Sequence, residues 1–144
     1  MENNYIFWDG NNPDYTIDSD LWGNIKAVLN SDKVFNILGY NEDEYKSINQ
    51  ITLIHPEALV KLIKDMQIIY SSIKSGKYYG ILPIKHKNES YKNIQFIAEY
   101  DINDNNIQCV ARYIDDGLCG IIYPIKSRKT RSDKGKLRKR NELI

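Results

Sequence analysis

The stretch NSDKVFNILGYNEDEY, residues 30–45, decides the fold because it predicts two short helices in close succession. Ser31 can N-cap a helix over Asp32–Leu38, because its hydroxyl can accept a hydrogen bond from a free amide of the first turn. Gly39 stands where helices commonly end in the left-handed conformation. By their spacing, three apolar side chains share one face and are expected to anchor this helix: Val34, Phe35 and Leu38.

The second helix of this stretch begins directly after the first. Asn41 can N-cap it, and Glu44, three residues later, completes the reciprocal pair of a capping box. Tyr40, just ahead of the cap, is expected to pack on Tyr45 as in a hydrophobic staple. Such dense capping indicates a structural corner rather than a catalytic site.

The segments on either side of this corner predict strands and one long helix. Before it, residues 15–17 and 25–29 alternate apolar and polar side chains, which is typical of a half-buried β-hairpin. Ile25, Ala27 and Leu29 are expected to face inward together. After the corner, residues 55–76 predict the longest helix, with Pro56 in its first turn and Gly76 at its end.

Three further strands are expected after the long helix, over residues 77–87, 91–102 and 106–115. Pro83 indicates an edge or a bulge in the first of them. Strands and helices in separate blocks favour an α+β fold with an antiparallel sheet that carries its helices on one face.

The length and composition are those of one packed domain, with 144 residues, 42% hydrophobic and 27% charged. No apolar run approaches the roughly 20 residues of a membrane span. The start, MENNYIFWDG, lacks the features of a signal peptide, and two cysteines give no metal or disulfide framework. We therefore expect a cytoplasmic protein with reduced thiols, although a Cys109–Cys119 disulfide stays open.

Four motifs, in order, resemble a PAS domain over residues 14–115. They are Asp18, Gly23, Ile25 and Asn30 around the first hairpin, Leu38-Gly39-Tyr40, the Gly-Tyr-to-Glu cap in GYNEDEY, and Ile54-His55-Pro56-Glu57 before the long helix. The chain departs from the family pattern at four places: Ala58, Asn88-Glu89-Ser90, Asn93 and Tyr113-Ile114-Asp115. The last departure replaces the segment that often passes a signal onward in this family.

The resemblance implies a PAS-like five-stranded antiparallel sheet, with short helices and one long helix on one face. It divides the chain into an N-terminal extension (1–13), a PAS-like domain (14–116) and a basic C-terminal tail or linker (117–144). It also implies a sensory or regulatory module in signal transduction or transcription control. We expect a homodimer, formed through the outer sheet face and the aromatic extension around Phe7 and Trp8, and an effector domain or partner beyond the tail.

An internal cavity is a further implication of the fold. Its expected wall consists of Leu62, Met66, Ile69, Ile94, Phe96, Ala98, Cys109 and Ala111. Three of these side chains are small, so they leave room for a small apolar ligand. A core filled by its own side chains is the reading we favour.

Catalytic and cofactor chemistry has little support in the residues. No nucleophile–base order, phosphate loop or metal-ligand spacing occurs, so we expect no enzyme. Some PAS domains hold haem through a histidine near the long helix, which would be His55 here. We favour His55 as a helix cap without a cofactor, His86 as a surface residue, and Cys109 as a small buried hydrophobe.

The charge is divided unevenly along the chain. Residues 1–125 carry a net charge of −6, and residues 126–144 carry +7. The acidic part would repel phosphates, so the alternative function, a regulator that binds DNA, depends on the tail alone. The candidate contacts are Arg128, Lys129, Arg131, Lys136, Arg138, Lys139 and Arg140.

Overall fold

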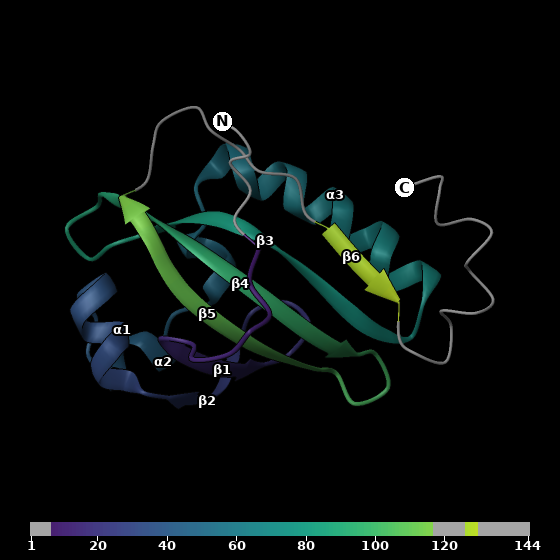
Figure 1. Cartoon of the computed structure of the whole chain (residues 1–144), viewed down its shortest axis with the longest axis horizontal. Coiled ribbons are helices and arrows are strands. Elements are labelled where there is room, and N and C mark those ends of the chain that lie inside the picture. Colours follow the sequence, from purple (N-terminus) through teal and green to yellow (C-terminus); the bar gives the residue numbers. More distant parts are fainter. Residues whose placement is uncertain (1–6, 117–125, 130–144) are drawn as a thin grey trace.

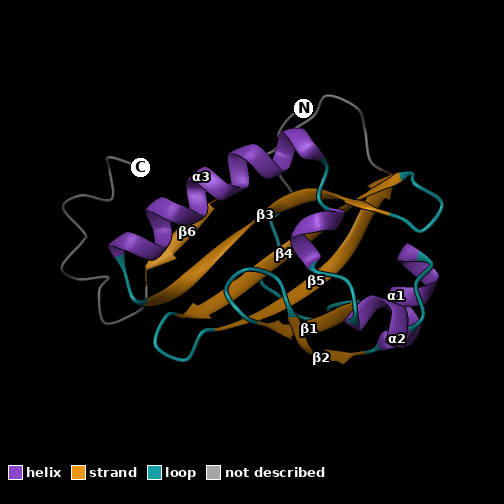
Figure 2. Cartoon of the chain, turned by 180° about the vertical axis from the view of Figure 1, so that it is seen from behind, coloured by secondary structure: helices purple, strands orange, loops and turns teal. Residues whose placement is uncertain are grey.

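One antiparallel sheet, with helices against one of its faces, organises the computed structural model, which describes residues 7–116 and 126–129 (Figure 1). The strands are adjacent in the order β2-β1-β5-β4-β3-β6. Figure 2, seen from behind, shows α1, α2 and α3 on the near side of the sheet. In chain order the elements are β1 (Tyr15–Ser19), β2 (Ile25–Leu29), α1 (Ser31–Leu38), α2 (Glu42–Lys46), the 3-10 helix η1 (Gln50–Leu53), α3 (Pro56–Ser72), β3 (Ser75–Lys85), β4 (Tyr91–Asp101), β5 (Asn106–Asp116) and β6 (Lys126–Lys129).

The α+β class and the five-stranded antiparallel sheet are confirmed, and the sheet has one strand more than predicted. β6 lies within the segment 117–144 that we interpreted as a tail, and it pairs with the first half of β3, from Gly76 to Tyr79. The second half of β3 is therefore an edge, as Pro83 indicated. The Pro83 carbonyl accepts a hydrogen bond from the His55 amide (3.0 Å), so its backbone faces away from β4, where a missing N–H costs no ladder bond.

The inward face predicted for β2 is wrong for Ala27 and Leu29, whereas Ile25 packs against the core as predicted. Leu29 is 64% exposed, and Val28 packs against the core instead. The cause is a register shift in the pairing with β1, which leaves Lys26 as an extra residue. One additional residue reverses the alternation of side chains, so the face changes within the strand.

The corner between α1 and α2 is built largely as predicted, except at its first residue. Asn30, and not Ser31, is the N-cap; it adopts the left-handed conformation (φ 65°) and makes no side-chain cap bond. Ser31 is already helical, and its hydroxyl donates to Glu42 (3.1 Å). Gly39 ends α1 at φ 86°, with its amide bonded to the Phe35 carbonyl at 2.9 Å.

The anchors of this corner are fewer than the spacing indicated. Val34 and Leu38 are completely buried, whereas Phe35 is 56% exposed. The capping box of α2 is confirmed, with reciprocal bonds of 2.9 Å between Asn41 and Glu44. Tyr40 stacks on Tyr45 with 6.3 Å between the ring centroids, as expected for a staple. Packing and caps together hold helices that are too short to form alone.

Replacing Gly39 by alanine is expected to lower the free energy of unfolding by about 1–2 kcal/mol, because a side chain is strained at positive φ. The added Cβ would also lie 2.9 Å from Cε1 of His86, so that ring must move. Urea denaturation measures the change. Asn36→Ala, at an exposed position of α1, is the control and should stay within about 0.5 kcal/mol of the wild type. Equal stability of Gly39→Ala and the wild type would contradict the assignment.

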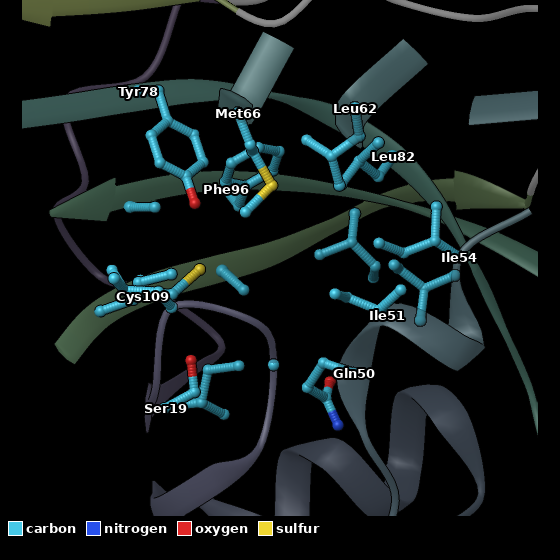
Figure 3. Close-up of a pocket in the computed structure, with 18 of the residues that line it drawn as sticks. Ser19, Gln50, Ile51, Ile54, Leu62, Met66, Tyr78, Leu82, Phe96 and Cys109 are labelled. Carbon is cyan, nitrogen blue, oxygen red and sulfur yellow. The ribbon is translucent and has the colours of Figure 1, made fainter. Parts of the chain in front are cut away.

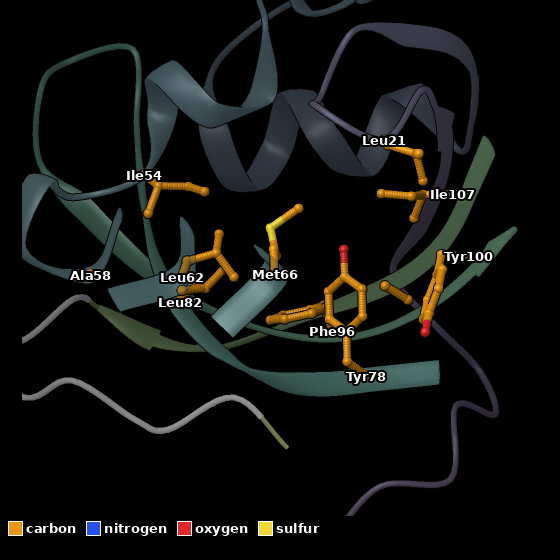
Figure 4. Packing of buried hydrophobic residues seen from close by; sticks show 11 residues of the cluster. Leu21, Ile54, Ala58, Leu62, Met66, Tyr78, Leu82, Phe96, Tyr100 and Ile107 are labelled. Atoms are coloured by element: carbon orange, nitrogen blue, oxygen red, sulfur yellow. The ribbon is translucent and has the colours of Figure 1, made fainter. Parts of the chain in front are cut away.

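α3 forms one side of the main core. It ends at Ser72, four residues before Gly76, because Ile73 is already extended; Gly76 is instead buried within β3. Figure 4 shows Leu62 and Met66 of α3 close to Phe96 of β4, with Tyr78 beside them. The long helix thus closes the space over the inner face of β3 and β4.

The N-terminal extension crosses the outer face of the sheet in front of β4 and β5 (Figure 1). The Arg112 guanidinium lies 4.8 Å from the ring centre of Trp8, and its Nε donates to Gln95 at 2.8 Å. A Cβ on Gly10 would lie 3.3 Å from Ile97, which shows how closely this backbone approaches the sheet. The prediction that the extension packs back is confirmed for Trp8, whereas Phe7 is 79% exposed.

Candidate functional site: an internal cavity

A cavity lies between the sheet and the helices because small residues are adjacent on the inner face. The strand register aligns one row across β3, β4, β5 and β1, consisting of Tyr78, Ala98, Cys109 and Ile17. The next row consists of Gly80, Phe96, Ala111 and Tyr15. Ala98 and Cys109 in the first row and Ala111 in the second have short side chains that do not reach the helices opposite, so a space is left between the layers.

The opposite wall comes from three helical segments and the turn of the first hairpin (Figure 3). Leu62 and Met66 project from α3, and Gln50 and Ile51 from η1. The space has a volume of about 120 Å³. A buried apolar cavity of about 150 Å³ is large enough for benzene, so this one suits a molecule of about that size or slightly smaller. The side chains of the wall thus leave part of this space unfilled.

Seven of the eight predicted wall residues line the cavity: Leu62, Met66, Ile94, Phe96, Ala98, Cys109 and Ala111. Ile69 is the exception, since it packs against the core cluster without reaching the cavity. The sequence reading missed the polar part of the wall, which includes Ser19, Gln50 and three tyrosines. Tyr15 and Tyr78 could have been predicted from the sequence, because the alternation of side chains in β1 and β3 places them on the inner face.

A hydrogen-bonded chain runs outward from one part of the wall. The Tyr15 and Tyr45 rings meet edge to face with 6.3 Å between their centroids, and Tyr45 donates to Oε1 of Gln50 at 2.7 Å. The Gln50 amide nitrogen in turn donates to the Ile48 carbonyl (3.3 Å), which can only accept. This last bond fixes the orientation of the amide, with its oxygen toward Tyr45.

A second chain begins at Tyr78. Its hydroxyl lies 3.0 Å from that of Tyr70, and Tyr70 donates to the Leu21 carbonyl at 3.3 Å. Ser19, which is 4% exposed, donates to the Asp20 carbonyl at 2.8 Å. Buried hydroxyls need such partners, because an unpaired buried donor costs about 1–3 kcal/mol.

The surroundings of the cavity disfavour ionised side chains and charged ligands. Burial raises the pKa of Tyr15, Tyr45 and Tyr78 well above the ordinary value for tyrosine. Burial also raises the pKa of the Cys109 thiol, which is free, to about 12. No Asp, Glu, Lys, Arg or His contributes to the wall within the described residues. A charged ligand would find no counter-ion here.

His55 acts as the predicted cap. Its Nδ1 accepts the Glu57 amide (3.1 Å) at the start of α3, and its ring lies 4.9 Å from the ring centre of Tyr91. It does not line the cavity, whose volume is also far too small for a porphyrin. The residues present therefore do not fit haem.

The residues predicted to contact DNA lie in β6 or outside the described residues. Arg128 and Lys129 belong to β6, and the remaining candidate DNA contacts lie outside the described residues: Arg131, Lys136, Arg138, Lys139 and Arg140. Residues 7–116 and 126–129 contain no group of three or more His, Cys, Asp or Glu side chains placed to hold a metal ion. None of their helices has the length and apolarity needed to cross a membrane.

Comparison with known proteins identifies the architecture. No protein-family model and no curated protein matches the chain. Among solved structures, the PAS-B domain of Drosophila melanogaster Cycle with bound glycerol aligns with a TM-score of 0.56 and 12% identity, over 69% of this chain and 99% of that one. A domain of a sensory box sensor histidine kinase/response regulator from Geobacter sulfurreducens aligns with a TM-score of 0.53 and 15% identity, over 68% of this chain and 81% of that one. The described part of the chain therefore has the fold of a PAS domain.

Proposed function

We propose that this protein is a PAS-type sensory module in signal transduction, which binds a small apolar ligand in its internal cavity and passes the signal to a partner or effector. The observation that carries the proposal is the cavity of about 120 Å³, lined mainly by apolar side chains. The two structural neighbours add support, since one belongs to a sensor kinase and the other holds glycerol. The proposed role is binding without catalysis.

The energetic argument for a ligand starts from the cost of empty space. An empty cavity lowers stability by about 24 cal/mol per Å³, which is about 3 kcal/mol for this volume. One larger side chain in place of Ala98, Cys109 or Ala111 could fill a cavity of this size. An occupant that restores the missing contacts would offset the cost, and its binding would stabilise the fold.

Benzene is the probe for the test, because its size matches the cavity. It is expected to bind the wild type, which chemical-shift changes of core methyl groups would report. Ala98→Leu should abolish binding, because three additional carbon atoms would occupy the space between Tyr78 and Cys109. Ala27→Leu adds the same atoms at an exposed position of β2 and should leave binding unchanged. Equal affinity of the Ala98→Leu variant and the wild type would overturn the proposal.

We also propose that the protein forms a homodimer through the outer sheet face and the N-terminal extension. Trp8 is held on the sheet by Arg112, so the extension presents Phe7, 79% exposed, next to this face. Exposed aromatic side chains are favourable anchors for protein contacts. Analytical ultracentrifugation of the full chain and of its Phe7→Ala variant tests whether the protein forms this homodimer.

A further inference from the structure

The cavity wall offers oxygen lone pairs but commits its hydroxyl protons elsewhere. Tyr45 donates to Oε1 of Gln50 at 2.7 Å, so its proton is already used. Tyr70 donates to the Leu21 carbonyl, so the proton between Tyr70 and Tyr78 comes from Tyr78. Each of these chains runs away from the cavity and ends on a carbonyl.

Ser19 of the wall follows the same pattern. Ser19 donates to the Asp20 carbonyl at 2.8 Å, which leaves its lone pairs for the cavity. Figure 3 shows Ser19 and Tyr78 directing their hydroxyl oxygens toward the cavity at the end where Cys109 lies. The Gln50 amide nitrogen, in contrast, is on the side remote from the cavity centre in this view and donates to the Ile48 carbonyl.

The chemistry of the wall thus restricts its ligand. An oxygen that only accepts, such as a ketone or ether oxygen, would face hydroxyl oxygens whose protons are used. A purely apolar molecule would leave the lone pairs of Ser19 and Tyr78 without a partner, and both residues are buried (4% exposed each). An ion would lose its hydration without gaining a counter-ion.

From this arrangement we infer that the cavity selects a small neutral molecule that brings its own hydrogen-bond donor, an O–H or N–H group accepted by the hydroxyl oxygen of Tyr78 or of Ser19. The rest of the molecule is an apolar body, for a total of about six or seven non-hydrogen atoms in view of the cavity volume. The inference rests on the proposed function, because it defines the ligand class of the same site.

Phenol and fluorobenzene test the inference, since they have the same number of non-hydrogen atoms and differ in the donor. Phenol is expected to bind the wild type at least threefold more tightly than fluorobenzene, as measured by calorimetry and by ¹⁹F resonance. The substitution that removes the accepting oxygen, Tyr78→Phe or Ser19→Ala, should weaken phenol binding by about three- to tenfold, which is the range of one neutral hydrogen bond. Neither substitution should change fluorobenzene affinity by more than about twofold.

Tyr40→Phe is the matched control. It also removes a buried tyrosine hydroxyl, bonded to the Lys85 carbonyl, but Tyr40 does not line the cavity, so phenol affinity should be unchanged. If both probes bind the wild type equally and the variants weaken them equally, the donor requirement is overturned while the proposed ligand site stands. If neither probe nor benzene binds, the proposed function is overturned together with this inference.

Discussion

Replacing Leu38 by alanine is expected to lower the free energy of unfolding by about 2–5 kcal/mol, the range for removing a fully buried leucine side chain. Leu38 has no exposed surface and lies in one buried cluster with Tyr45, Leu53 and Ile94. Its carbonyl also accepts the Lys87 amide at 2.8 Å, which joins the corner to the end of β3. Because domains are stable by only about 5–15 kcal/mol, such a loss is visible in urea denaturation as a large shift of the midpoint.

Phe35→Ala in the same helix is the matched control. Phe35 was predicted to share the anchoring role, yet more than half of its surface is exposed, so its removal should change stability by less than about 0.5 kcal/mol. Comparable losses for the two variants would show that α1 packs in another orientation.

The second large effect is a fall in stability at alkaline pH. Burial raises the pKa of Cys109, Tyr15, Tyr45 and Tyr78 in the folded state. Above the ordinary values of about 9–10, the unfolded chain loses these protons while the folded chain keeps them. The folded state then binds more protons, so the free energy of unfolding falls as pH rises, by about 1.4 kcal/mol per pH unit for each group. Below about pH 8 the contribution is complete and constant.

Urea denaturation between pH 8 and pH 11 measures this slope. Tyr45→Phe should reduce it by about 1.4 kcal/mol per pH unit, because one ionising group is then absent. Repeating the series at higher salt separates the effect from repulsion by net charge, which salt screens. A free energy of unfolding that is constant up to pH 11 would contradict the burial of these groups.

The features that the sequence predicted well are those that depend on near neighbours. The capping box of Asn41 and Glu44 needs only three residues, and the end of α1 needs only Gly39, so pattern and outcome agree. The face of β2 depends on its pairing with β1, where one additional residue reverses the alternation. No local pattern reports that bulge, and Leu29 was therefore assigned to the wrong side.

The cavity shows the same division. We could predict its small residues, Ala98, Cys109 and Ala111, because a short turn between two long strands, β4 and β5, largely determines which residues pair. Gln50 was not predicted, because its position depends on how a 3-10 turn returns to the sheet after α2. Ile69 follows the helical stripe by spacing, but the cavity extends only as far along α3 as Met66.

The order of strands also has a consequence for how the protein is made. β1 lies between β2 and β5, so Tyr15 pairs with Ala111, a residue synthesised near the end of the domain. Until β5 leaves the ribosome, the edge of β1 that pairs with β5 stays open. Such distant pairings form slowly, because the loop between them must be closed first. The corner after the hairpin gains its packing only then as well, because the buried Val34 and Leu38 lie in one cluster with Ile94 and Ala111 of the later strands.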